Sequence, residues 1–382
     1  MSIEIDKTDA TKNDQLFSKV AELIELARKK VSTTVNLTMV HTYFEIGRMI
    51  VEDEQQGKER AEYGKTVLKD LSFRLSKKFG RGFSVENLDR MRFFYKIYSN
   101  SISSTPLTKL QSHELQSNEI HLNPSGEGNQ FNTLWQKSTA KSPTFTLSWS
   151  HYLILMRIEN PEERRFYEIE ALQQNWSEAQ LKRQYHSSLY ERLALSRNKD
   201  EVMKLANEGQ TIVKPEDIFK NPLSLEFLGL AERTSYSETD IEQAIISKLQ
   251  QFILELGKGF LFEARQKRFT FDEKHYFVDL VFYNRLLQCF VLIDLKTDEL
   301  MHQDLGQMQM YVNYYDRIEK LEYEKPTIGI LLCKKKNKAM VELTLPKDAN
   351  IYASEYSLYL PDKKLLQQKL SEWLREFENG EE

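Results

Sequence analysis

The sequence predicts an α+β protein with a mostly α-helical N-terminal half and a C-terminal α/β domain built on a mixed sheet. Two observations support this fold class. In the first half of the chain, apolar residues recur every three or four positions, which is the period of one helix face. From residue 236 onward, the expected order is a helix, three strands, a helix and a strand. This αβββαβ order is typical of a sheet covered by helices.

The composition excludes several classes of protein. The chain has 382 residues, of which 40% are hydrophobic and 29% are charged, and its formal net charge is −4. It is too polar for an integral membrane protein and too apolar for a fully disordered one. No apolar run approaches the roughly 20 residues that span a bilayer, and the N-terminus has no apolar signal segment. We expect a cytoplasmic protein without a membrane partner, whose cysteines, Cys289 and Cys333, are buried and reduced.

The chain divides into four expected segments. Residues 1–100 form a helical region, and residues 101–145, rich in Ser, Thr, Asn and Gln, form a polar linker or insertion. Residues 146–235 form a second helical part of the N-terminal half. Residues 236–382 form the α/β domain.

A helix-turn-helix pattern lies within the first segment. Two helices are expected at 63–79 and 84–98, joined by a glycine-containing turn, and Ser84 is a favourable N-cap for the second. An earlier helical periodicity covers residues 15–55.

The C-terminal domain begins with a helix whose buried side carries Ile245, Leu249 and Phe252. A capping signal at 239–242 starts this helix, and Gly257 ends it. The remaining expected elements are strands at 265–271, 276–283, 289–295, 327–333 and 351–355, and helices at 303–316 and 361–377.

Charged residues interrupt two of these strands. Asp279 lies within the apolar run 277–283, and Asp294 and Lys296 lie within the run 290–296. Because burying an unpaired charge costs free energy, each of them needs a partner. Residues two apart on a strand point to the same face, and an antiparallel neighbour can bring Asp279 beside Asp294.

Two interpretations of these three residues remain open. Carboxylates are the hard oxygen ligands that Mg²⁺ prefers. A nearby ammonium group can hold or help deprotonate an attacking water, or neutralise charge that develops on a phosphate. The set therefore suits metal-dependent hydrolysis of a phosphodiester. The alternative is a buried Asp–Lys ion pair that only stabilises the sheet.

The wider sequence resembles a known family. The element order, with Asp279, fourteen intervening residues, Asp294 and Lys296, resembles the PD-(D/E)xK nuclease superfamily. Three segments are similar to sequences of the YhcG-like family of predicted nucleases. They are Phe-Val-Asp-Leu-Val-Phe-Tyr-Asn, Val-Leu-Ile-Asp-Leu-Lys and Asp-Leu-Gly-Gln-Met-Gln-Met-Tyr. The resemblance continues into the N-terminal half, at Tyr-Phe-Glu-Ile-Gly-Arg and Phe-Gly-Arg-Gly-Phe-Ser-Val-Glu-Asn, and leaves out only about residues 100–145. It implies a restriction-endonuclease-like sheet.

The resemblance also implies roles for the strand residues. Asp279, Asp294 and the backbone carbonyl of Leu295 would bind the metal, Mg²⁺ or Mn²⁺. Lys296 would position the water or stabilise the phosphate. One residue departs from the superfamily's name, since Val278 stands where that name has proline.

Three further residues receive roles by resemblance, each with an open alternative. Gln307 and Tyr311 match the Gln-x-x-x-Tyr pattern of the RecB-like branch and lie one helical turn apart, so they would support the metal shell or contact DNA. They are otherwise a polar helix position and a packed tyrosine. Glu242 would be the acid of the superfamily's first helix, or simply an acid that the helix dipole favours near an N-terminus.

The N-terminal half contains a basic segment. Nine basic and three acidic residues lie between positions 65 and 96, so this segment carries +6 and the rest of the chain −10. A second helix of a helix-turn-helix unit can enter the major groove, where Asn and Arg read bases, and the resemblance implies a winged-helix-like region. The alternative is the solvated basic face of a helical bundle. The expected nucleic-acid contacts here are Lys77, Lys78, Arg81, Asn87, Arg90 and Arg92.

A second basic run follows the fourth expected strand. Within it, Lys335 and Lys336 are expected to contact a phosphate backbone, although a plain surface loop fits the sequence equally.

The sequence thus predicts a Mg²⁺-dependent (or Mn²⁺-dependent) nuclease that hydrolyses DNA and whose N-terminal half binds DNA. Two alternatives stay open. One is a catalytically weak DNA-binding or assembly factor. The other is an accessory subunit of a restriction or mobile-element system that is active only in complex with its partner proteins. A homo-oligomer is compatible with each of them.

Overall fold

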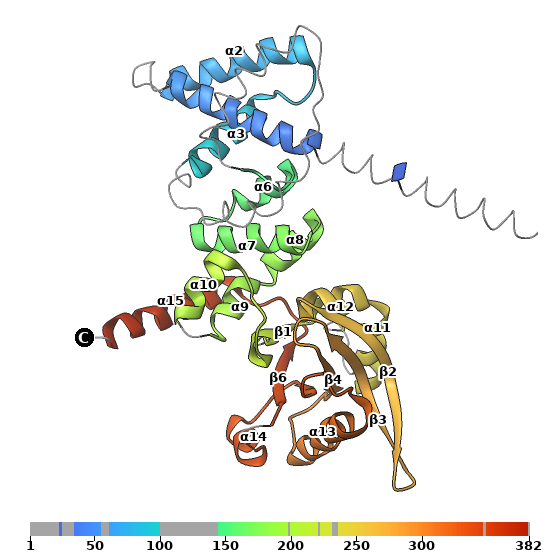
Figure 1. Ribbon diagram of the computed structural model, residues 1–382. Helices are drawn as coiled ribbons and strands as arrows, with labels where there is room; N and C mark the ends of the chain where they lie inside the picture. The colour runs from blue at the N-terminus through green and yellow to red at the C-terminus, as the bar shows by residue number, and fades with distance from the viewer. Residues whose placement is uncertain are drawn as a thin grey trace, which may run out of the picture. The chain divides into compact units, whose positions relative to one another are not determined.

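The computed structural model describes residues 23–24, 34–54, 61–99, 144–197, 199–220, 222–230, 236–346 and 349–380. The chain forms two compact units, residues 1–164 and 165–382 (Figure 1). The division falls inside the 146–235 segment of the sequence analysis, whose domain boundaries stay a prediction. The predicted linker lies outside the described residues except for positions 144 and 145, and so does most of the helical periodicity before residue 34.

The described part of the N-terminal unit is helical, as predicted. Residues 34–54 are helical and are followed by α2 (Ala61–Phe79), α3 (Val85–Tyr98) and α6 (Trp149–Leu155). Ser84 caps α3 and accepts a hydrogen bond from the backbone N–H of Asn87. Aromatic rings form much of the core, with the centroids of Phe94 and Phe145 4.8 Å apart. Over residues 34–54, 61–99 and 144–164 there is no strand, so this described part contains no wing.

A six-stranded mixed sheet forms the centre of the C-terminal unit and confirms the predicted fold class. Its spatial order is β1-β6-β5-β4-β3-β2. The antiparallel part is β2–β3–β4, and β4, β5, β6 and β1 pair in parallel. The strands are β1 (Leu223–Ser224), β2 (Phe260–Phe271), β3 (Lys274–Asn284), β4 (Cys289–Leu295), β5 (Ile328–Cys333) and β6 (Ile351–Ser357).

Helices cover both faces of this sheet. On one face, α11 (Glu238–Ser247) and α12 (Leu249–Leu256) pack their apolar side chains against β3, β4 and β5. On the other face, α13 (His302–Tyr314) packs against the same strands. Both cysteines are buried and unbridged, as predicted. Every residue of β4 except Phe290 is therefore buried, including Asp294 near its C-terminal end.

The remaining elements of this unit complete the helical cover. They are α7 (Pro161–Gln173), within which the division between units falls, α8 (Glu178–His186), α9 (Leu189–Ala194), α10 (Lys199–Glu208), η2 (Pro215–Ile218), η3 (Glu226–Leu228), η4 (Tyr315–Glu319), α14 (Lys338–Thr344) and α15 (Lys363–Gly380). In the described part of the chain, no helix combines the length and the apolar character that crossing a membrane requires.

The prediction of a single long helix before β2 is wrong in two respects. The cap is Ser237, whose side chain accepts a hydrogen bond from the backbone N–H of Asp240. The helix is also interrupted at Lys248, with φ −125° and ψ 36°, where the ammonium group donates to the carbonyl oxygen of Phe227 at 2.5 Å. Apolar periodicity continues through the break, so only the tertiary contact reveals it.

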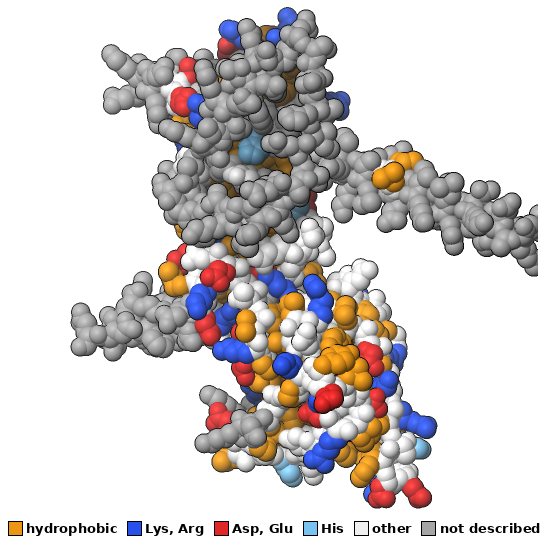
Figure 2. Space-filling model, in the orientation of Figure 1, with side chains coloured by type: hydrophobic (Ala, Val, Ile, Leu, Met, Phe, Trp, Pro, Cys, Tyr) orange, Lys and Arg blue, Asp and Glu red, His pale blue; other side chains and the backbone are white. Residues whose placement is uncertain are grey.

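Acidic and basic side chains are interspersed on the face of the C-terminal unit that Figure 2 shows. The described surface there is not of one sign. Contacts with a polyanion on this face would therefore depend on a few well-placed side chains.

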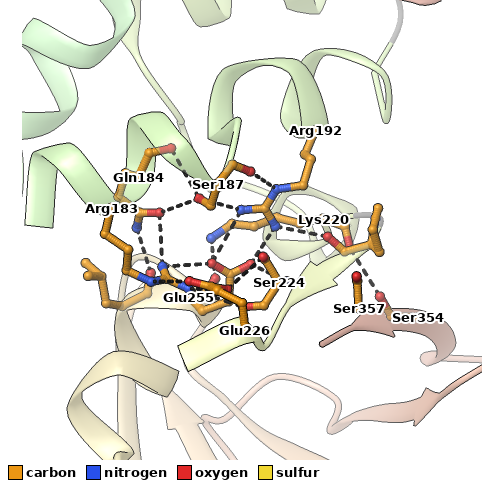
Figure 3. Close-up of polar contacts among 12 residues, drawn as sticks. Arg183, Gln184, Ser187, Arg192, Lys220, Ser224, Glu226, Glu255, Ser354 and Ser357 are labelled. Carbon is orange, nitrogen blue, oxygen red and sulfur yellow. Dashed lines mark hydrogen bonds and ion pairs between the residues drawn. The ribbon is translucent and has the colours of Figure 1, made fainter. Parts of the chain in front are cut away.

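A buried polar cluster attaches α8 and α9 to α12 (Figure 3). Glu255 of α12 is fully buried, and Arg192 of α9 donates to its carboxylate at 2.5 Å. Arg183 of α8 donates to the same carboxylate at 3.0 Å, and Lys220 donates to the backbone carbonyl of Glu255. The cluster makes the helices after residue 165 part of the unit that contains the sheet.

Candidate active site

Two aspartates meet where β3 and β4 run side by side. The antiparallel register pairs Leu280 with Ile293, which puts Asp279 and Asp294 at the next opposing positions. The backbone N–H of Leu295 donates to Oδ2 of Asp279 at 2.9 Å. The end of β4 therefore holds the Asp279 carboxylate, and the juxtaposition that the sequence predicted is present.

Lys296 follows the last residue of β4 and turns its ammonium group back onto Asp294. Its Nζ lies 2.8 Å from Oδ2 of Asp294 and 3.7 Å from a carboxylate oxygen of Glu238, in the first turn of α11. Its backbone N–H donates to the carbonyl oxygen of Leu332 in β5 at 2.7 Å. Both the main chain and the side chain of Lys296 are thus fixed.

The environment shifts the ionisation of all three residues. Burial raises the pKa of Asp294 to about 7, and the Asp279 carboxylate adds to this effect while Lys296 opposes it. Burial likewise raises the pKa of Asp279. Burial alone would lower the pKa of Lys296, but Asp294 and Glu238 raise it to about 12. Lys296 is therefore a cation at neutral pH.

Glu242 lies beside this pair but does not join it. Its carboxylate is buried and accepts hydrogen bonds from Nε of Arg265 and from the side-chain amide of Gln266, the latter at 2.5 Å. The same amide donates to Oδ1 of Asp279 at 2.9 Å. Sequence reasoning missed Arg265 and Gln266, because the register of β2 with β3 decides that Arg265 pairs with Leu280 and that Gln266 falls opposite Asp279.

Gln307 and Tyr311 contact each other on α13. The Gln307 amide donates to the phenol oxygen of Tyr311, which is buried. Burial raises the pKa of Tyr311, and the carboxylates of Asp294 and Asp279 add to the rise. Tyr311 therefore lies within electrostatic reach of the aspartate pair, whereas Gln307 is exposed.

The residues present suit a divalent cation that keeps most of its water. Across the described ranges, no group of three His, Cys, Asp or Glu side chains converges closely enough to hold a metal ion. The candidate ligands are accordingly Asp279 and Asp294, and Mg²⁺ commonly binds through one or two carboxylates and several waters. When Asp294 is ionised, four carboxylates against Lys296 and Arg265 leave an excess of two negative charges here. That excess favours a cation. The part expected of the Leu295 carbonyl stays a prediction.

Comparisons with known proteins decide the family. Residues 216–371 match the YhcG PDDEXK nuclease domain, and residues 19–117 and 127–192 match the DUF1016 N-terminal domain. Over 357 residues, the chain is 39% identical to "Putative nuclease YhcG" of Escherichia coli (strain K12), and the alignment covers 93% of each protein. The chain belongs to the YhcG family. The resemblance found in the sequence is thereby confirmed.

Two solved structures are similar to part of this YhcG-family chain. One is a repair endonuclease from Pyrococcus abyssi, with 20% identity over 35% of this chain and 51% of that chain and a TM-score of 0.23. The other is an EndoMS–dsDNA2 complex, with 18% identity over 35% of this chain and 49% of that chain and a TM-score of 0.25. The chain thus aligns with about half of each. The fold assignment rests on the sheet of the YhcG-family chain itself.

Of the residues expected to contact DNA in the N-terminal unit of this YhcG-family protein, some are bonded within the unit and others are exposed to solvent. Asn87 donates to the carbonyl oxygen of Gly82 at 3.1 Å and accepts from Arg90 at 3.0 Å. Arg92 forms ion pairs with Glu54 at 2.7 Å and Asp89 at 2.5 Å, which tie it to its own helical bundle. Lys77, Lys78, Arg81 and Arg90 are exposed.

The second basic run also splits into two kinds of residue. Lys335 is exposed and lies 3.7 Å from Glu299. Lys336 turns inward, and its ammonium group donates to the carbonyl oxygen of Ala353 at 2.9 Å. Of these two lysines, Lys335 is the one that presents its charge to solvent, so the expectation of a phosphate contact is stronger for Lys335 than for Lys336.

Proposed function

We propose that this protein is a nuclease that needs Mg²⁺ or Mn²⁺, hydrolyses phosphodiester bonds in DNA, and binds DNA through its N-terminal half. The observation that carries the proposal is the placement of Asp279 and Asp294 on neighbouring strands with the Lys296 ammonium 2.8 Å from one of them. The YhcG PDDEXK nuclease domain match over residues 216–371 supports the class of reaction.

In this proposal the two aspartates bind the metal, and neighbouring groups hold one of them in place. Asp279 and Asp294 would hold the divalent cation, which when bound supplies Lewis acidity and lowers the pKa of water. The Asp279 carboxylate keeps its orientation because the Leu295 N–H and the Gln266 amide each bind one of its oxygens. These hydrogen bonds prepare the site before substrate arrives.

Lys296 acts as a cation in this proposal and not as a base. Two carboxylates raise its pKa to about 12, so an uncharged amine is rare at neutral pH. A fixed ammonium group can neutralise the charge that builds on the phosphate in the transition state. Of the two roles that the residue types left open for Lys296, the proposal adopts this one, and the raised pKa supports it.

DNA binding by the N-terminal half rests on fewer side chains than the sequence suggested. Lys77 and Lys78 lie in the last turn of α2, and Arg81 lies in the turn that follows the helix; all three are exposed. Side chains of this type neutralise backbone phosphates and give sequence-independent affinity. In this proposal Arg92 and Asn87 stabilise the helical bundle, because Arg92 is paired with Glu54 and Asn87 donates a hydrogen bond to the carbonyl oxygen of Gly82.

The test is a cleavage assay on plasmid, linear and branched DNA and on RNA, with Mg²⁺ or Mn²⁺ present. Wild type is expected to cleave DNA, and Asp294→Asn and Lys296→Ala are expected to lose at least ~100-fold in rate, because each removes charge from the reacting centre. Asp298→Asn, at an exposed acid two residues beyond Lys296, is the matched control and should cleave normally. Undiminished cleavage by both site variants would contradict the site assignment.

The same assay separates the alternative functions. DNA that is bound but never cleaved, with either metal and every substrate, would indicate a DNA-binding or assembly factor. Cleavage that requires both this protein and a cell extract, and that the extract alone does not give, would indicate an accessory subunit of a larger system.

A further inference from the structure

Gln266 breaks the alternation of the strand that carries it. Successive side chains of an extended strand point to opposite faces. Arg265 and Gln266 are successive residues of β2, yet both donate to the carboxylate of Glu242. The reason is the backbone of Gln266, whose φ of 46° lies in the left-handed region. Residues with a side chain adopt that region at a cost, and such strain gathers at functional sites.

The strained backbone aims one amide group at two acids. Nε2 of Gln266 carries two hydrogens, and it donates to Oε2 of Glu242 at 2.5 Å and to Oδ1 of Asp279 at 2.9 Å. The backbone N–H of Leu295 binds the other oxygen of Asp279 at 2.9 Å. Both oxygens of Asp279 are therefore fixed, and each keeps a lone pair free.

The amide also separates two carboxylates of like charge. Glu242 comes from α11 and Asp279 from β3, and Gln266 of β2 stands between them. Without a donor between them, two partly buried carboxylates would repel each other and reorient. Glu242 would keep its ion pair with Arg265, whereas Asp279 would keep only the neutral Leu295 N–H on one oxygen, so Asp279 is the acid that is held less firmly.

We infer that Gln266 is a positioning residue of the metal site, and that Glu242 acts through Gln266 instead of binding the metal. This inference rests on the proposed nuclease function. It assigns to Glu242 the task of holding the Gln266 amide, while Gln266 holds the Asp279 carboxylate toward the cation. Hydrogen bonds of this kind to a metal-binding carboxylate are commonly worth about 10- to 100-fold in metal affinity.

The experiment measures binding of Mn²⁺ alone, by titration calorimetry without DNA, and then the Mn²⁺ concentration that gives half-maximal cleavage. Gln266→Ala is expected to weaken Mn²⁺ binding about 10- to 100-fold and to raise the half-maximal concentration by a similar factor. At saturating Mn²⁺ its kcat should recover toward that of wild type, because Lys296 and Asp294 are untouched.

A second glutamine supplies the control for folding. Gln288 also has a left-handed backbone, with φ 55°, and it is exposed in the turn before β4. Glycine tolerates this conformation, so Gln288→Gly should unfold at a urea midpoint no lower than that of wild type, and Gln266→Gly at a midpoint no lower than that of Gln266→Ala, which loses the same hydrogen bonds. Only Gln266→Gly should lose Mn²⁺ affinity, which a purely structural role of Gln266 would not produce.

The outcomes are distinguishable. If wild type binds Mn²⁺ and cleaves DNA while Gln266→Ala and Gln266→Gly bind Mn²⁺ equally well, the inference is overturned and the proposed function stands. If wild type neither binds Mn²⁺ nor cleaves, the proposed function is overturned and the inference with it. The double variant Glu242→Ala, Gln266→Ala is compared with Gln266→Ala alone. If the double variant binds Mn²⁺ more weakly, Glu242 binds the metal directly and the inference is also overturned.

Discussion

Only 3% of the Asp294 surface is exposed, and the carboxylate of Asp279 lies at the opposing position on the neighbouring strand. Burial and that neighbour raise the pKa of Asp294 to about 7. A raised carboxyl pKa means that the folded state disfavours the charged form, by about 1.4 kcal/mol for each pKa unit. A site that binds a cation tolerates this cost because the cation removes it.

The stability of Asp294→Asn therefore distinguishes a metal site from a structural ion pair. In EDTA at pH 8, the variant is expected to unfold at a higher urea concentration than wild type. Its free energy of unfolding should be about 1 kcal/mol greater, because the substitution removes a buried charge and keeps the shape of the side chain. Urea unfolding followed by circular dichroism gives the free energy. Asp298→Asn should match wild type. A loss of several kcal/mol in Asp294→Asn would instead favour the ion pair with Lys296 as a purely structural feature.

At the scale of the elements, the polar cluster around Glu255 determines which helices belong to the nuclease unit. Burial alone would raise the pKa of Glu255, but Arg192, Lys220 and Arg183 outweigh burial and lower it to about 2. The cluster thus holds α8 and α9 against α12, although the DUF1016 match extends to residue 192. Family boundaries and structural boundaries differ here because the attaching residues are dispersed along the chain.

Glu255→Gln tests this attachment through its pH dependence. At neutral pH the variant should lose about 3–5 kcal/mol, since it leaves buried cations uncompensated. The folded-state pKa lies below the ordinary 4.5, so the stabilisation by Glu255 is complete above about pH 4.5 and is lost as the pH falls toward about 2. The difference between wild type and variant in urea unfolding should shrink over that interval.

An exposed ion pair provides the comparison. Lys182 and Glu178 lie 2.5 Å apart on α8 with about half of each side chain exposed. Glu178→Gln should cost about 1 kcal/mol or less at any of these pH values. An equally small effect of Glu255→Gln at neutral pH would contradict the attachment.

At the scale of the whole molecule, the net charge of −4 combines a basic segment of +6 with a remainder of −10. Part of that basic charge is neutralised within the N-terminal unit, where Arg92 pairs with Glu54, which lies outside the segment; the pair of Arg74 with Asp70 is already included in the +6. The charge available to a partner is therefore smaller than the count of residues suggests.

A variant with Lys77, Lys78 and Arg81 all changed to alanine should bind duplex DNA more weakly. The slope of log affinity against log salt should fall by about one unit for each phosphate that the variant no longer neutralises. Fluorescence anisotropy at several salt concentrations measures both quantities. Arg74→Ala, on the same helix but paired with Asp70, is the control and should change neither. Unchanged binding by the triple variant would favour the solvated basic face of a bundle.

The sequence by itself determined the fold class, the bounds of β4 and the meeting of Asp279 with Asp294 and Lys296. Each follows from a local rule. Apolar periodicity predicts the helix or strand, and a charge within an apolar run requires a partner. Two residues of one strand that are two positions apart share a face, which joins Asp294 to Lys296 whatever the neighbouring elements are.

Only the tertiary structure decided what Gln266 contacts and where the helix before β2 breaks. It also decided which basic side chains are already bonded to other groups of the protein. Gln266 reaches Glu242 and Asp279 because a left-handed residue reverses the alternation of β2. Lys248 breaks the helix where it meets a carbonyl group of Phe227, distant along the chain. Periodicity describes one element at a time, whereas these features depend on register and packing between elements.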